Sequence, residues 1–223
     1  MDAYDERDDG GLARVCAAMP PGRRRHAAAL ALWRLRAPLL MLGLDPEWGV
    51  HRTLLDAVFH TLLLPPGAAG AEPAVADLLG APFFACPLEG EAEGAAAEVQ
   101  AEVLAELAAW PHTAAPDPEH TERLIGLPRA LAHSADLVVA DALWDHPARH
   151  AHTRYLATGP DGVLGYHSAR NHAVEAVCHT LVTPLPPDTP LPATPDGREA
   201  LALCETFSAE LAATLSWCTT LGR

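Results

Sequence analysis

Lysine is absent from the sequence, and isoleucine, asparagine and glutamine occur once each, so arginine supplies all 15 basic side chains. This bias is typical of GC-rich coding DNA, which also favours alanine, proline and histidine. The 12 histidines therefore do not by themselves indicate a metal or catalytic site. Aromatic residues make up only 5% of the chain, so the core must be built mainly from alanine, leucine and valine.

Positive charge is scarce. The 15 arginines face 29 aspartates and glutamates, which gives a formal net charge of −14. A nucleic-acid partner is not expected, because phosphate binding requires a basic surface. Self-association as a homodimer, or binding of a basic protein, is compatible with this charge.

Long hydrophobic runs are also missing. The apolar stretch after residue 25 is interrupted by Arg34 and Arg36, and no stretch reaches the roughly 18 to 20 apolar residues of a membrane span. The five cysteines are an odd number without a CxxC pair, and no signal-peptide pattern precedes them. We therefore expect a cytoplasmic protein with reduced thiols and no membrane partner.

Apolar residues recur at helical spacing along most of the chain. This pattern predicts an all-α, single-domain multi-helix bundle over 11–223, after a disordered acidic N-terminus at 1–10. Proline-rich connections are expected at 65–87, 111–118 and 184–195. The predicted helices cover 12–19, 23–41 with a kink or split at Pro38, 45–64, 74–79, 89–110, a short stretch ending near 125, 128–144, 168–182 and 196–219.

One segment has the pattern of a small β-hairpin. Two short runs containing Tyr, Leu and Val flank a Gly-Pro-Asp-Gly turn signal within 153–167. An ordered loop is the equal alternative there.

Histidine and glutamate share one face of the helix predicted over 168–182. His172, Glu175 and His179 lie at positions i, i+3 and i+7, and imidazole and carboxylate groups are common ligands of divalent metals. The first and last of them are about 10 Å apart along a straight helix, so a metal site would need ligands from another helix. A structural role for this stripe is the competing interpretation.

A second set of candidates lies on the helix predicted over 45–64. Asp56 and His60 are one turn apart, and His51 precedes them by about two and a half turns. A carboxylate that orients an imidazole is common in catalytic and metal sites, but a solvent-facing ion pair has the same spacing. These six residues are the candidate ligands of a divalent metal.

Other motifs are weaker. Cys178 next to His179 suggests a thiolate, but adjacent helical residues point about 100° apart, so a buried thiol is the expected state. The local signatures of phosphate loops, nucleophile elbows and HExxH zinc sites are absent from the sequence.

The first part of the chain resembles a bacterial helical family typified by YjaG. The resemblance rests on a short helix, a proline-containing second helix and the sequence Leu-Asp-Ala-Val-Phe-His-Thr-Leu over 55–62, and on His-Ala-Val-Glu over 172–175. It covers about half of the chain at most and departs from the family around 145–167. The resemblance implies an all-helical bundle and no functional residue.

Three functions are compatible with these patterns. The first is a non-catalytic acidic binding or accessory protein, such as a toxin-neutralising factor, that associates with itself or with a basic protein. The second is a metal-dependent helical-bundle enzyme that uses the histidines and carboxylates named above. The third is a membrane-surface role for the arginine-rich segment 23–36, for which a partly buried helix is the preferred alternative.

Overall fold

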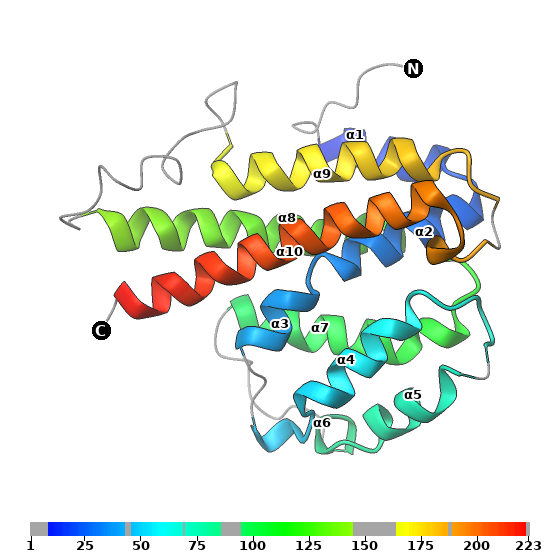
Figure 1. The fold of residues 1–223 in the computed structure, drawn as a ribbon, viewed down its shortest axis with the longest axis horizontal. Coiled ribbons are helices and arrows are strands. Elements are labelled where there is room, and N and C mark those ends of the chain that lie inside the picture. Colours follow the sequence, from blue (N-terminus) through cyan, green and yellow to red (C-terminus); the bar gives the residue numbers. More distant parts are fainter. Residues whose placement is uncertain are drawn as a thin grey trace.

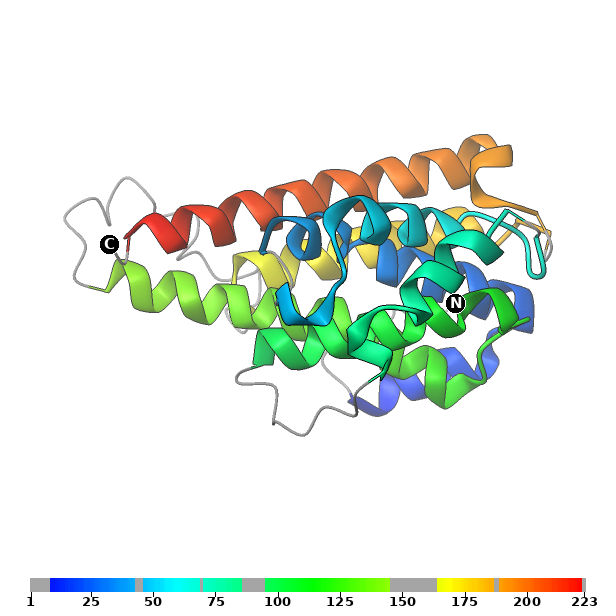
Figure 2. The ribbon, with the colours of Figure 1, turned by 90° about the horizontal axis from the view of Figure 1, so that it is seen from below.

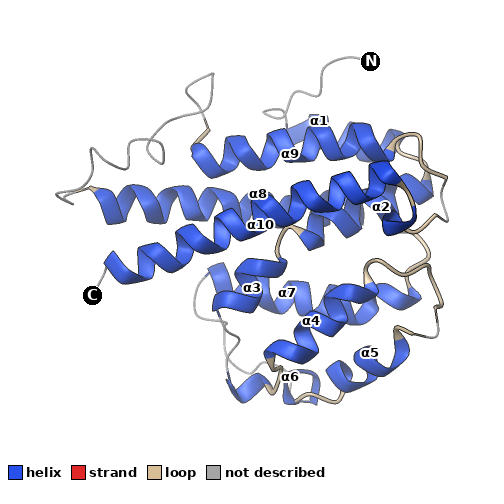
Figure 3. Ribbon diagram, viewed as in Figure 1, coloured by secondary structure: helices blue, strands red, loops and turns tan. Residues whose placement is uncertain are grey.

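Helices account for all regular structure in the computed structural model, which describes residues 9–42, 46–68, 70–85, 95–144, 164–186 and 189–221 (Figure 3). No strand occurs in these ranges, so the prediction of an all-α multi-helix fold is confirmed. The α-helices are α1 (Asp9–Ala18), α2 (Pro21–Trp33), α3 (Arg36–Leu42), α4 (Arg52–Thr61), α5 (Glu72–Leu79), α6 (Pro82–Ala85), α7 (Ala95–Ala109), α8 (Pro118–Leu143), α9 (Tyr166–Val182) and α10 (Pro195–Leu221).

Two groups of helices share one core (Figure 1). In the first group, α2, α8, α9 and α10 all pack against one another, and α1 packs against α8. In the second group, α4, α5 and α7 pack together, and α3 joins the groups because it contacts both α10 and α4. Figure 2 shows that α8 and α10 run along the length of the molecule.

Helix α2 lies at the centre of the first group because its side chains are small. Every residue from Arg25 to Trp33 is buried, and four of them are alanines, which let the neighbouring helices approach closely. Leu30 and Leu32 fill the remaining space, and burial of each contributes about 2 kcal/mol to stability. Residues 25–33 of the arginine-rich segment are therefore an interior helix, which agrees with the preferred alternative of a partly buried helix.

Pro38 splits the helix predicted over 23–41. In a continuous helix its ring would clash with the carbonyl group of residue 34, and the chain turns at Arg34 and Leu35 before α3 begins. The expected split is confirmed. It leaves the side chain of Arg34 inside the first group of helices, where it is only 2% exposed.

The helix predicted over 45–64 is interrupted, and this prediction is corrected. A short 3₁₀ turn at Pro46–Trp48 ends at Gly49, whose φ of 68° is unfavourable for other residues, and a Cβ there would lie 2.3 Å from Pro82. Helix α4 starts again after His51, whose Nδ1 accepts a hydrogen bond from the Leu54 amide at 3.1 Å. Residue 45, where this helix was predicted to begin, lies outside the described residues.

The two stretches predicted on either side of Pro128 form one continuous helix, α8, with this proline inside it. The proline removes one backbone hydrogen bond, but it is buried, and the turns around it pack against α2 and α9. Tertiary packing thus overrides the local signal for a break.

The other described boundaries agree with the predictions to within a few residues, and the predicted start of the helix over 89–110 lies outside the described part of the chain. The proline-rich segment 65–87 contains α5 and the short α6, and α7 ends in a 3₁₀ turn at Trp110–His112. Residues 153–163 of the predicted hairpin, and residues 1–8, lie outside the described part, whereas Tyr166 and His167 belong to α9. No described helix is both long and apolar enough to cross a membrane.

A carboxylate from α8 caps the start of α9. Gly165, at the N-cap position, has no side chain, and Asp136 accepts hydrogen bonds from the backbone amides of His167 (2.8 Å) and Ser168 (3.0 Å). The Ser168 hydroxyl donates a further bond to the same carboxylate at 2.7 Å. A Cβ on Gly165 would lie 2.3 Å from Asp136, so only glycine allows this approach.

We expect Asp136→Ala to lower the free energy of unfolding by about 2 kcal/mol, because the first amides of α9 lose their acceptor. Urea denaturation followed by circular dichroism measures the change. The matched control is Asp141→Ala, an exposed aspartate on the same helix, which should change stability by less than about 0.5 kcal/mol. Equal effects of the two substitutions would contradict this role of Asp136.

Candidate functional site

Helix α9 buries polar residues where an interior helix normally carries apolar ones. Its buried set consists of His167, Ser168, Asn171, His172, Val174, Glu175, Cys178, His179 and Val182. The helix packs against α2, α8 and α10, so these side chains face the inside of the first helix group. This buried polar face of α9 is the strongest candidate for a functional site in the described structure.

The carboxylate of Glu175 is the centre of the face, and it is 1% exposed. Arg129 of α8 donates to both of its oxygens, from Nη2 to Oε1 at 2.5 Å and from Nε to Oε2 at 3.2 Å. Arg34 donates from Nη1 to Oε2 at 3.4 Å and to Oδ1 of Asn171 at 2.7 Å. One carboxylate therefore joins α2, α8 and α9, and we call Arg34, Arg129 and Glu175 the arginine–glutamate cluster.

The cluster contains two positive charges and one negative charge in a place with little access to water. Burial of charges is costly, and the mutual attraction offsets this cost only when the geometry is good and the remaining polar atoms are hydrogen bonded. The paired contacts of Arg129 and the amide oxygen of Asn171 meet part of this requirement, but Nε of Arg34 and Nδ2 of Asn171 are buried without a hydrogen-bond partner in the described structure. Removing one member would leave the others as buried, uncompensated charges.

Two of the three histidines of the face, His172 and His179, are held in their neutral form. The pKa of His179 is lowered to about 4, mainly by burial; Glu175 acts in the opposite direction, and the guanidinium groups of Arg34, Arg23 and Arg129 contribute to the lowering. Burial and Arg129 also lower the pKa of His172. His172 and His179 are therefore neutral near pH 7.

Two thiols continue the face toward α10. The Sγ atoms of Cys178 and Cys204 lie 3.6 Å apart, and Cys178 also contacts the carbonyl oxygen of Ala200 at 3.6 Å. Burial raises the pKa of Cys204 well above its usual value, whereas the hydrogen bond from Cys204 lowers the pKa of Cys178. Both cysteines are free and buried, as the sequence predicted for Cys178.

The structure separates the six predicted ligands into two sets. His172, Glu175 and His179 belong to the buried polar face of α9, whereas His51, Asp56 and His60 are on or next to α4. Within the described ranges, no group of three His, Cys, Asp or Glu side chains is arranged to hold a metal ion. Both oxygens of Glu175 already accept bonds from arginine, so a metal there would have to displace a guanidinium group.

The α4 set has structural contacts. His51 caps α4, and Asp56 accepts bonds from Arg36 at 2.9 Å and 2.5 Å. His60 is exposed, donates from Nδ1 to the backbone oxygen of Asp56 at 2.8 Å, and packs edge-on against Trp33. This arrangement matches the solvent-facing ion pair considered as the alternative.

Sequence reasoning missed the two arginines and Asn171. Arg34 lies 141 positions and Arg129 lies 46 positions from Glu175, so no local motif joins them. One signal was present: Asn171 is the only asparagine in the chain, and it is on the same predicted face as Glu175. A unique amide beside a carboxylate on a buried face indicates a polar cluster.

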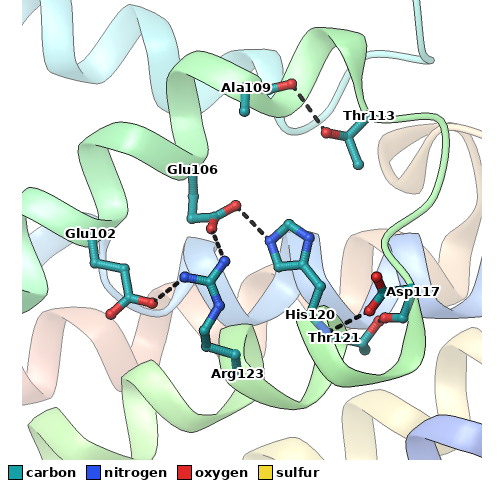
Figure 4. A network of polar contacts seen from close by, with 8 residues as sticks. All are labelled: Glu102, Glu106, Ala109, Thr113, Asp117, His120, Thr121 and Arg123. Atoms are coloured by element: carbon teal, nitrogen blue, oxygen red, sulfur yellow. Dashed lines mark hydrogen bonds and ion pairs between the residues drawn. The ribbon is translucent and has the colours of Figure 1, made fainter. Parts of the chain in front are cut away.

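A second polar network joins α7 to the start of α8 (Figure 4). Arg123 donates to Glu102 at 2.7 Å and to Glu106 at 2.5 Å, and His120 contacts Glu106 at 2.8 Å. Asp117 caps α8 by accepting a bond from the His120 amide at 2.7 Å. The contacts fix two acidic segments side by side, with a single arginine between them.

In comparisons with known proteins, no family model, curated protein or solved structure matches the chain. The resemblance to the YjaG family therefore stays a prediction. The function has to be inferred from the geometry described above.

We expect Glu175→Gln to lower the free energy of unfolding by about 3 to 5 kcal/mol, because Arg34 and Arg129 stay buried without their counter-charge. Urea denaturation at pH 7 measures this loss. The matched control is Glu199→Gln on the exposed side of α10, for which we expect less than about 0.5 kcal/mol. A loss at Glu175 as small as the control would mean that the cluster does not hold the helices together.

The neutral state of His179 predicts a pH dependence of stability. The folded pKa of about 4 lies below the unfolded value of 6.5, so the unfolded chain binds protons more readily between these values. Stability is therefore present above about pH 6.5 and falls progressively toward pH 4, by about 3 kcal/mol from His179 alone.

Urea titrations at pH 7.0, 6.0 and 5.0 test this slope. We expect His179→Gln to flatten it, and the control substitution His60→Gln, at an exposed position, to retain the wild-type slope. A His179→Gln protein with an unchanged slope would refute the assignment.

Proposed function

We propose that the chain is a non-catalytic binding protein of the accessory or toxin-neutralising kind, and that its partner is a basic protein. The observation that carries the proposal is the difference in exposure between arginine and carboxylate side chains. Seven of the 11 described arginines are buried or half-buried, whereas nine of the described carboxylates are exposed. Exposed carboxylates therefore outnumber exposed arginines by nine to four in the described part of the chain, so the surface there has the same negative sign as the formal net charge of −14.

The internal arginines are bound through backbone and side-chain oxygens. Arg25 is buried, stacks over the ring of Trp110 at 4.4 Å and donates to the carbonyl of Thr113. Arg24 donates to the carbonyl oxygens of Pro116 and Met19 at 2.8 Å and 2.7 Å. Arg34, Arg129 and Arg36 bind side-chain oxygens of other helices. These arginines therefore hold segments of the chain together.

A larger share of the described carboxylates than of the described arginines is exposed. Among the described residues, the exposed arginines are Arg14, Arg52, Arg123 and Arg198, whereas the exposed acidic residues are Glu47, Glu72, Asp77, Glu98, Asp117, Glu119, Asp141, Glu199 and Glu205. A surface with this imbalance attracts basic proteins and speeds their association at low salt. In the network of Figure 4, the half-buried Glu102 and the buried Glu106 both pair with Arg123, and His120 also contacts Glu106.

The remaining polar groups support binding rather than catalysis. Glu175 is occupied by arginines, Asp136 by the amides of α9, and Asp56 by Arg36. Each of these carboxylates has a structural task. We also propose the cytoplasm as the compartment, because the described cysteines are free even where the Sγ atoms of Cys178 and Cys204 lie 3.6 Å apart.

Affinity capture tests the proposal. The untagged protein, coupled to beads through its amino terminus, is exposed to native extract of its own cells at about 50 mM salt and washed in steps to about 500 mM. We expect a stoichiometric partner with an isoelectric point above about 9, whose purified form associates at least tenfold more slowly at high salt.

Two charge-matched variants locate the contact. Glu98→Gln/Glu119→Gln/Glu122→Gln removes three charges near the network of Figure 4, and Glu47→Gln/Glu199→Gln/Glu205→Gln removes three elsewhere. We expect the first to slow association with the captured partner more than the second. Capture of no basic protein, or identical behaviour of both variants and the wild type, would contradict the proposal.

A further inference from the structure

The second half of α8 presents large apolar side chains to solvent. Leu137 is 58% exposed, Val138 43% and Trp144 69%. Scattered exposed apolar residues are ordinary, but three within two turns of one helix form a patch of the kind used for protein association. Figure 2 shows this part of α8 at the edge of the molecule, beyond the end of α7.

The two faces of this half-helix are clearly different. Val139 and Leu143 form a small core with Cys218 and Trp217 of α10, so one face is used within the chain. On the other face, His133, Leu137 and Asp141 are spaced four residues apart and form one ridge. The exposed residues Ala130, Ala140 and Trp144 flank it, and we call these six residues the α8 ridge.

The α8 ridge is complementary to a copy of itself. If two α8 helices cross in antiparallel direction with a twofold axis at Leu137, the two leucines meet at the centre. His133 then faces Asp141 of the partner subunit, and Asp141 faces the partner's His133. One turn further out, the small Ala130 faces the large Trp144 of the partner subunit. Apolar contact, charge and side-chain size all match in this one register.

We propose that two copies of the chain associate through the α8 ridge, with the helices antiparallel and Leu137 on the twofold axis. A second copy fits better than a basic protein because the ridge carries one histidine and one aspartate, not an excess of acid. The inference does not depend on the proposed function. From Ala130 to Trp144 the helix rises only about 21 Å, so the dimer has a small interface and is weak.

Sedimentation equilibrium of the purified full chain alone, from about 1 to 300 µM, tests the association. We expect reversible dimerisation that Leu137→Asp abolishes, because two carboxylates would meet on the axis. The matched control is Leu79→Asp, at a position on α5 that is 49% exposed and distant in sequence, which should dimerise like the wild type. A wild type that stays monomeric throughout, or equal dimerisation of Leu137→Asp, would overturn the proposal.

Charge exchange tests the register. His133→Asp places two carboxylates opposite each other and Asp141→Arg places arginine opposite histidine, so each should weaken the dimer about tenfold. The double variant His133→Asp/Asp141→Arg restores opposite charges across the axis and should recover wild-type association or exceed it. Circular dichroism checks that each variant is folded. A double variant as weak as the product of the two single effects would exclude the antiparallel pairing.

Discussion

The buried carboxylate of Glu175 is the point on which the packing of α2, α8 and α9 depends. Arg129 binds both of its oxygens and Arg34 binds one, while Asn171 accepts a second bond from Arg34. The alanine-rich stretch of α2 offers few large side chains with which to specify how its neighbouring helices are oriented, and directional ion pairs can supply that specification. The disadvantage is that the charges are buried. The loss of one member of the cluster leaves the others uncompensated and destabilises the fold.

The burial of arginines also affects the charge of the molecular surface. A chain without lysine that binds many of its arginines internally leaves a surface dominated by carboxylates. Such a surface suits binding of basic proteins, and the proposed function rests on it. The α8 ridge is different in kind, because its apolar centre and its paired histidine and aspartate suit a second copy of the chain. The same protein can therefore bind a basic partner through its acidic surface and a second copy of itself through the α8 ridge.

The sequence allowed the helical class and most helix positions to be predicted, because apolar periodicity and proline signals are local. The split at Pro38 follows from a clash within one helical turn. Gly49 and Pro128 were misjudged because their outcome depends on distant partners: Gly49 lies against Pro82, and Pro128 is buried in the continuous α8. In the candidate site, the polar stripe of α9 could be predicted, but the binding of Glu175 by arginines could not. Arg34 and Arg129 come from distant parts of the sequence, and they meet Glu175 only after folding.

A double-mutant cycle of Arg129→Met and Glu175→Met, measured by urea denaturation at pH 7, tests most directly whether the arginine–glutamate cluster holds the bundle together. It separates the interaction between the two groups from the loss of packing around each of them. The account predicts a coupling free energy of about 2 kcal/mol or more, with the double variant more stable than the sum of the single losses implies. Additive losses, with a coupling below about 0.5 kcal/mol, would show that the two side chains act independently and that packing alone arranges these helices.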